Sequence, residues 1–221
     1  LSFRMESGRQ IPFLTRFEGP INVRVQGEVS DTLLSDLDQL LSRLRREANI
    51  NIAMSESAQP QIIVQAIPRS VLNNAVPRAA CFVVPRISSW DEFLRVRQTQ
   101  TVDWTTLTKR DRAIMFVPSD VAPQEIRDCL HEELAQALGP LNDLYRLPDS
   151  VFNDDNIHSV LTSFDMLVLK AYYSPALANG MTRRQVAARL PALLGRMNPA
   201  GNRGVRLTGN DTNRDWIDAV Q

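Results

Sequence analysis

The sequence predicts a single α+β domain, and three observations support this fold class. Four short apolar runs have the composition of strands, and they lie at 21–26, 61–67, 79–84 and 114–117. Two longer segments, 31–48 and 124–138, carry apolar residues at helical spacing. Helix-start signals gather again after residue 160, so we expect a helical C-terminal part. The chain has 221 residues, 43% of them apolar, which is enough to bury a core of its own.

The first part of the chain is expected to form an arm, a strand and a helix. Residues 1–20 have few periodic apolar positions and form the arm. In 21–26 apolar and polar residues alternate, as in a half-buried strand. The helix over 31–48 buries a stripe of leucines and begins at Ser30 or Asp31, whose side-chain oxygen caps the free amides. The arginines at its end are interpreted as a solvated face rather than a nucleic-acid patch.

The middle of the chain is expected to complete the sheet and to add a second long helix. A short helix and a loop over one sheet edge are expected in the stretch that contains Trp90, Phe93 and Trp104. The helix over 124–138 follows Pro123 and stops at Gly139-Pro140.

Two capping boxes predict two further helices. The T-x-x-D sequence at 162–165 predicts a helix over 163–173, and T-x-x-Q at 182–185 predicts the last helix, which Pro191 is expected to kink or break. The domain is therefore expected to span 1–197. A mobile tail rich in Gly, Asn and Arg is expected over 198–221, with an anchor at Trp216, Ile217 and Val220.

Composition and missing motifs exclude several functional classes. Lys plus Arg and Asp plus Glu each number 25, so no overall charge draws the protein to nucleic acid or to an anionic membrane. No apolar run approaches the roughly 18 residues of a membrane span. The phosphate-binding loop, the dinucleotide fingerprint and the nucleophile elbow are all missing from the sequence. The two cysteines, Cys81 and Cys129, fit either one bridge or two buried thiols.

The densest polar chemistry lies between Cys129 and Asp155. His131-Glu132 suggests the H-E-x-x-H zinc motif, but the residue four positions after His131 is Ala135, which has no donor atom. A register shifted by one places residues on all five fixed positions of H-E-x-x-H-x-x-G-x-x-H, and these are Glu132, Glu133, Gln136, Gly139 and Asn142.

In this register the sequence resembles the metzincin zinc peptidases. The segment 150–153 stands where that family has its Met-turn. Leu161-Thr162-x-x-Asp165, followed by Tyr172-Tyr173, resembles the C-terminal helix of matrixin-type members. The resemblance implies a metzincin-like twisted mixed β-sheet with two main packing helices and a helical C-terminal subdomain.

The pattern EExxQxLGxxND, with the later SxFNDD and GMT, is also similar to a proteobacterial family of uncharacterised secreted and lipoprotein-like domains. That similarity implies an extracytoplasmic location, in the periplasm or anchored to a membrane of the envelope, with a leader or lipid anchor removed before Leu1. Export makes oxidation of thiols possible, so we predict a disulfide between Cys81 and Cys129.

The departures from the metzincin pattern concern the residues that carry the chemistry. Glu132, Gln136 and Asn142 replace all three histidines, and Phe152 replaces the methionine of the Met-turn. Zinc favours imidazole and thiolate, so we expect no tight zinc site and no other cofactor. Glu133 stands at the position of the general base, but a base without a metal lacks the electrophilic half of the mechanism.

Each of these residues also has a purely structural interpretation. Glu132 and Glu133 are either solvent-facing carboxylates or members of a buried cleft network. Gln136 and Asn142 are expected to bond the backbone at the turn, and Gly139 to be a helix C-cap. His131 and His158 are expected at surface or capping positions rather than as ligands. A further alternative is an all-oxygen site for a hard cation such as calcium, which would join Glu132 to Asp143, Asp149, Asp154 and Asp155.

The predicted function is a non-catalytic, pseudopeptidase-like binding or scaffolding protein of the bacterial cell envelope. Its contact surface would be the former substrate cleft, and its partner a protein or peptide rather than nucleic acid. The alternative is an active metal-dependent hydrolase or peptidase with Glu133 as general base, its metal held by oxygen ligands or by His131.

Overall fold

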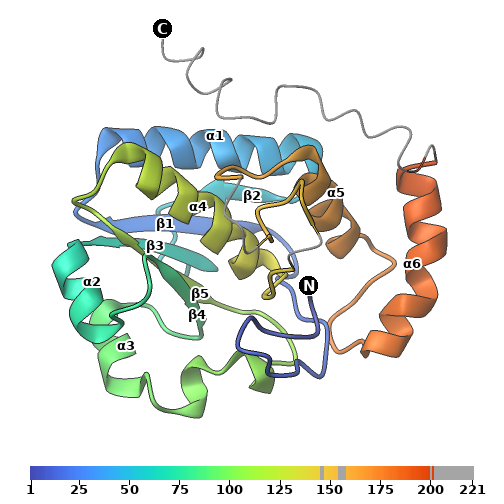
Figure 1. Ribbon diagram of the computed structural model, residues 1–221, viewed down its shortest axis with the longest axis horizontal. Coiled ribbons are helices and arrows are strands. Elements are labelled where there is room, and N and C mark those ends of the chain that lie inside the picture. The colour runs from blue at the N-terminus through green and yellow to red at the C-terminus, as the bar shows by residue number, and fades with distance from the viewer. Residues whose placement is uncertain (145–146, 154–157, 200, 202–221) are drawn as a thin grey trace, which may run out of the picture.

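A five-stranded mixed sheet forms the centre of the computed structural model, which describes residues 1–144, 147–153, 158–199 and 201 (Figure 1). The strands are β1 (Ile21–Gly27), β2 (Ile52–Met54), β3 (Ile62–Ile67), β4 (Phe82–Pro85) and β5 (Ala113–Pro118). Their order across the sheet is β2-β1-β3-β5-β4. All neighbouring strands are parallel except β4, which pairs antiparallel with β5 and leaves its other side at the sheet edge.

Helices cover both faces of this sheet, as Figure 1 shows. They are α1 (Asp31–Glu47), α2 (Arg69–Ala75), α3 (Trp90–Val96), α4 (Pro123–Leu138), α5 (Ser163–Tyr172) and α6 (Arg183–Met197). Short 3-10 turns lie at Gln100–Val102 and Trp104–Thr106. The α+β class, the mixed sheet and the two long packing helices expected from the sequence are confirmed.

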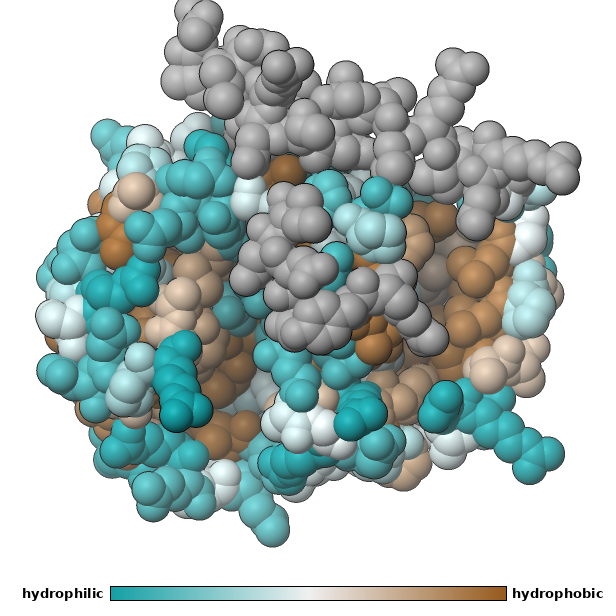
Figure 2. Space-filling model, viewed as in Figure 1, coloured by the Kyte–Doolittle hydropathy of each residue, from teal (hydrophilic) through white to brown (hydrophobic). Residues whose placement is uncertain are grey.

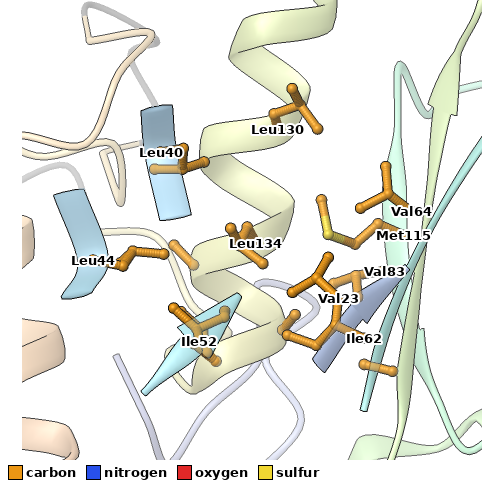
Figure 3. Packing of buried hydrophobic residues seen from close by; sticks show 14 of the residues in the cluster. Val23, Leu40, Leu44, Ile52, Ile62, Val64, Val83, Met115, Leu130 and Leu134 are labelled. Atoms are coloured by element: carbon orange, nitrogen blue, oxygen red, sulfur yellow. The ribbon is translucent and has the colours of Figure 1, made fainter. Parts of the chain in front are cut away.

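The main core lies between the sheet and the two long helices. In Figure 3 leucines of α1 and α4, among them Leu40 and Leu134, point toward apolar side chains of all five strands. Those labelled on the strands are Val23, Ile52, Ile62, Val64, Val83 and Met115. The opposite face of the sheet is covered by α2 and α3 over an aromatic cluster of Phe82, Trp90, Phe93 and Phe116. Alternate residues of β3 therefore enter different cores, which fixes the register of this strand.

The capping predictions agree with the structure. The hydroxyl of Ser30 accepts the amide of Leu33 and caps α1. Complete capping boxes begin α5 at Thr162 and α6 at Thr182. The expectation that Pro191 breaks the last helix is wrong in its stronger form, since α6 continues through it. Pro191 and Ala187, whose carbonyl loses its usual donor, are both exposed, so water can replace the lost hydrogen bond.

The arm makes specific contacts with the rest of the fold, which its sequence did not indicate. Ile11, Leu14 and Phe17 are each buried. Backbone bonds join Leu14 to Gly180 and Met181, just before α6, and the amide of Glu6 donates to the carbonyl of Leu141, beyond the end of α4. The arm thus runs from the C-terminal subdomain to the C-terminal end of α4. Most of the expected tail, with its Trp216, Ile217 and Val220 anchor, lies outside the described residues.

Cys81 and Cys129 form the predicted disulfide. Cys81 immediately precedes β4, and Cys129 lies in the first half of α4, so the bond ties the edge strand to the helix that carries the motif. Disulfides persist in oxidising compartments, which indicates an extracytoplasmic environment. Among the described helices, none combines the length and apolarity required to cross a membrane.

Candidate functional site

A cleft of about 570 Å³ opens between α4, the edge strand β4 and the N-terminal arm. The apolar residues that line it include Val76, Ala79, Phe82, Val83 and Trp104. Its polar wall carries four carboxyl groups, from Glu6, Glu132, Glu133 and Asp143. Figure 2 shows a hollowed band of apolar side chains between polar rims over the area where Figure 1 draws β4. A smaller cleft of about 250 Å³ is lined by both cysteines of the disulfide and shares Ala80, Cys81 and Glu132 with the first.

The buried guanidinium of Arg110 holds the end of α4 in place beside this cleft. It donates to the carbonyls of Gln136 (2.5 Å), Ala137 (2.6 Å) and Gly139 (2.6 Å), and of these the carbonyl of Gln136 also accepts the amide of Gly139. The same group stacks 4.5 Å above the ring of Trp104, a cleft residue. Arg110 is 4% exposed, so these contacts take the place of the hydrogen bonds that its guanidinium would make with water. The helix terminus and the apolar wall of the cleft are therefore fixed by one side chain.

Gly139 is the C-cap of α4, as expected, but the need for glycine comes from packing. Its φ of 174° lies outside the left-handed region that favours glycine. A Cβ at this position would lie 2.5 Å from the ring of Tyr172. Tyr172 in turn donates its hydroxyl to the carbonyl of Thr15, and Tyr173 donates to that of Leu138. The close approach of α5 to the end of α4 thus requires the missing side chain.

Replacing Gly139 with alanine is therefore expected to lower the free energy of unfolding by about 1–3 kcal/mol. The new Cβ would force the packed ring of Tyr172 out of its position. Urea denaturation followed by circular dichroism measures the change. Gly195→Ala is the matched control, because a Cβ there meets nothing within 4 Å, and in a helix it is expected to stabilise by about 0.5–1 kcal/mol. Equal unfolding free energies for the two variants would contradict the packing role of Gly139.

The carboxyl groups of the cleft have perturbed acidities. Burial raises the pKa of Glu132 to about 7, with further contributions from Glu6 and Asp128. Burial also raises the pKa of Glu133 well above its usual range, and Glu132, Glu6 and Asp143 add to this. Glu133 is only 4% exposed, and it makes no hydrogen bond or ion pair with the part of the chain that the structure describes. The cluster is thus electrostatically unfavourable in its fully ionised form.

The motif residues are only partly brought together. Glu132, Glu133 and Gln136 line the cleft, which agrees with the cleft-network interpretation of the two glutamates. Asn142 and Phe152 are buried but are not among the lining residues, and Phe152 belongs to the main core.

Gln136 has a different partner from the expected backbone group, because its side-chain nitrogen donates to a carboxylate oxygen of Glu6 at 2.9 Å. Sequence reasoning missed Glu6, since nothing in the local pattern of the arm indicates contact with a helix more than a hundred residues later.

Two of the aspartates considered for an oxygen-ligand site, Asp143 and Asp149, are among the described residues, and of these two Asp143 is the one found beside Glu132. Oxygens of Glu6, Glu132 and Asp143 all lie within 4.8 Å of one another. Asp149 contributes its carbonyl to the hydroxyl of Thr162 instead. Asp154 and Asp155 lie outside the described residues. The observed acidic group therefore contains the expected residues Glu132 and Asp143 and, in addition, Glu6 of the arm, which was not expected.

The two histidines lie away from this cleft. His131 is fully buried, so the expectation of a surface position was wrong, although its Nδ1 does cap a backbone group by accepting the amide of Leu161. Burial lowers the pKa of His131 to about 3, with help from Arg43 and Arg127, so the ring is neutral at ordinary pH. His158 donates from Nε2 to the carbonyl of Pro148 and lines the smaller cleft.

The segment 150–153, which matches the Met-turn position, is held by the capping carboxylate of α5. Asp165 accepts hydrogen bonds from the hydroxyl of Ser150 (2.5 Å) and the amide of Val151 (3.1 Å), as well as from the amide of Thr162. Burial nevertheless raises the pKa of Asp165, against the effect of these bonds. Phe152 of this turn thus belongs to the main core and Val151 lines the smaller cleft, while none of the four residues lines the larger one.

Comparison with known proteins places the chain in a family. Two solved structures of myroilysin are similar in part, each with 17% sequence identity. One match covers 58% of this chain and 53% of myroilysin with a TM-score of 0.35, and the other covers 80% and 63% with a TM-score of 0.36. The chain thus matches less than two-thirds of the length of myroilysin. No curated protein matches the sequence. A family model described as "Protein of unknown function (DUF2927)" matches residues 1–192, and the chain therefore belongs to the DUF2927 family.

Proposed function

We propose that the protein is a non-catalytic binding module of the bacterial cell envelope and that the cleft beside α4 is its contact surface. The observation that carries this proposal is the composition of the cleft wall. Glu132 and Gln136 occupy positions where a metzincin-type peptidase needs imidazoles, and both histidines of the chain lie elsewhere. Without nitrogen ligands the cleft lacks the zinc ion that acts as the electrophile of a zinc peptidase. It is still a concave surface with apolar side chains and a few polar groups, as binding sites usually are.

The chemistry of the cleft favours an extended peptide with a basic side chain. One wall is the edge strand β4, where the carbonyl of Val83 already accepts the indole N–H of Trp104, and sheet edges accept peptides as additional strands. The apolar residues along this wall, among them Phe82 and Val83, would contact alternate side chains of the peptide. The carboxylates of Glu132 and Asp143 would pair with a lysine or arginine. The disulfide supports the envelope location, where such a partner would be another secreted or membrane-attached protein.

Selection of peptides from a displayed random library tests this function. We expect the immobilised protein to enrich sequences with lysine or arginine, and Glu132→Gln to weaken binding of the selected peptide about tenfold, because one charge partner is removed. Glu125→Gln is the matched control, since Glu125 lies on the same helix but does not line this cleft, and it is expected to bind like the parent. Enrichment of peptides without basic residues, or equal affinities for both variants, would contradict the proposal.

The alternative, a metal-dependent hydrolase, is favoured by one observation. Glu133 is buried and lines the same cleft as Glu6, Glu132 and Asp143, so a general base would share the cleft with an oxygen-ligand metal site. The same preparation therefore goes into a peptidase assay with a denatured protein substrate and added divalent metals. We expect no cleavage. Metal-dependent cleavage that disappears in a folded Glu133→Gln variant would replace the binding module with an enzyme.

A further inference from the structure

We propose that Glu6, Glu132 and Asp143 form a binding site for a hard divalent cation, with calcium as the ion, and that this ion fastens the N-terminal arm across the cleft. The inference goes beyond the proposed binding function and does not depend on it. Two independent observations carry it, namely the geometry of the three carboxylates and the environment of a fourth.

The first observation is the convergence of oxygen ligands from three separate parts of the chain. One oxygen from each of the three carboxylates lies within 4.8 Å of the other two. Calcium binds oxygen at 2.3–2.6 Å, so two ligands on opposite sides of the ion are up to about 5 Å apart. Glu132 belongs to the rigid helix α4, Asp143 follows its end, and Glu6 belongs to the arm. Calcium accepts such irregular ligand sets more readily than magnesium, which requires a near-ideal octahedron.

The second observation is Glu133. Its side chain lines the same cleft, is 4% exposed and has no hydrogen-bond or ion-pair partner among the residues described. A buried carboxyl group in that position is costly unless a cation or proton compensates for it. Arg78 also lines the cleft, but it is exposed and forms no ion pair with any of the four carboxylates in the described part of the chain. A divalent ion at the three-carboxylate site would place positive charge in the cleft that the Glu133 side chain lines.

The position of Glu6 makes the ion a link between the arm and the body of the domain. The backbone amide of Glu6 donates to the carbonyl of Leu141, and a carboxylate oxygen of Glu6 accepts from Gln136. These bonds already place the arm at the cleft, and an ion shared with Glu132 and Asp143 would hold it there. A basic side chain of a peptide would compete with the ion for the same carboxylates, so calcium would weaken peptide binding.

Calorimetric titration of the chelator-treated, full-length protein with calcium chloride tests the site. We expect one ion per chain and a melting temperature that rises by about 5–10 °C at a hundredfold excess over Kd. Glu6→Gln and Asp143→Asn keep the side-chain shape and are each expected to weaken calcium binding about tenfold or more. Glu125→Gln, on an exposed part of α4, is expected to bind calcium like the parent.

Terbium luminescence gives the location of the ion without any substitution of a ligand. Terbium occupies calcium sites and emits when a nearby tryptophan transfers energy to it, and Trp104 lines this cleft. We expect emission that calcium displaces and that Trp104→Phe abolishes while calorimetry still detects the ion. The proposal is overturned by lack of calcium binding in the parent, by calcium binding that Glu6→Gln and Asp143→Asn leave unchanged, or by terbium emission that survives Trp104→Phe. Because no peptide is present in these titrations, their outcome is separate from that of the peptide selection.

Discussion

Arg110→Met is expected to lower the free energy of unfolding by about 3–5 kcal/mol. Methionine preserves much of the volume of the arginine side chain, but the carbonyls of Ala137 and Gly139 lose the donor that satisfies them, and that of Gln136 keeps only the amide of Gly139. These groups lie at the buried end of α4, where water does not replace the lost bonds. The ring of Trp104 also loses its cation partner. Urea denaturation followed by tryptophan fluorescence and by circular dichroism measures the change.

Two matched variants separate the role of the planar guanidinium group of Arg110 from a general effect of its positive charge. Arg110→Lys keeps the positive charge but not the planar group that reaches several carbonyls, so we expect it to be destabilised almost as strongly. Arg95→Met removes an exposed arginine from the last turn of α3 and is expected to change stability by less than about 0.5 kcal/mol. A fully stable Arg110→Lys would show that the charge alone is sufficient.

Removal of the disulfide, as the double variant with alanine at Cys81 and Cys129, is expected to cost about 4 kcal/mol. The two cysteines are 48 residues apart, and a closed loop of that length restricts the unfolded chain by about this amount in the chain-entropy model. Alanine leaves no buried hydroxyl at Cys129, which is 4% exposed. Thermal and urea denaturation in the presence and absence of a reducing agent measure the effect.

The reducing agent provides the internal control for this prediction. It is expected to destabilise the parent by nearly the same amount as the double variant and to leave the double variant unchanged. Two outcomes together would contradict the disulfide. The stability of the parent would not change with the reducing agent, and the unfolded, unreduced parent would have two thiols that react with an alkylating agent.

The regular elements were predictable because their signals are local. Leucine spacing determined α1, and the Thr162 and Thr182 capping boxes placed the starts of α5 and α6. The strand β2 has only three residues, and α2 has no side-chain cap, so neither gave a pattern that the sequence analysis detected. Burial of the arm was missed for a related reason, since its apolar residues contact different elements and share no period.

The candidate site was predictable only as far as the helix that carries it. Glu132 and Gln136 are four residues apart on α4, so helical geometry places both on one face, and both line the cleft. Asn142 follows the helix end, where tertiary contacts rather than helical period set the chain direction, and Asp143 lines the cleft in its place. The approach of Glu6 depends on how a distant segment folds back, which no spacing in the sequence expresses.

The strand order determines which parts of the sheet can form while the chain is being synthesised, N-terminus first. β5 lies between β3 and β4, although β4 precedes it in the sequence. Until β5 is available, the sheet is limited to β2, β1 and β3, and the edge of β3 that later pairs with β5 is open. An open edge of apolar residues is a template for intermolecular pairing. Incomplete chains are thus expected to need a holding chaperone until residue 118 has emerged, and the covalent link from Cys81 to Cys129 forms only after that stage.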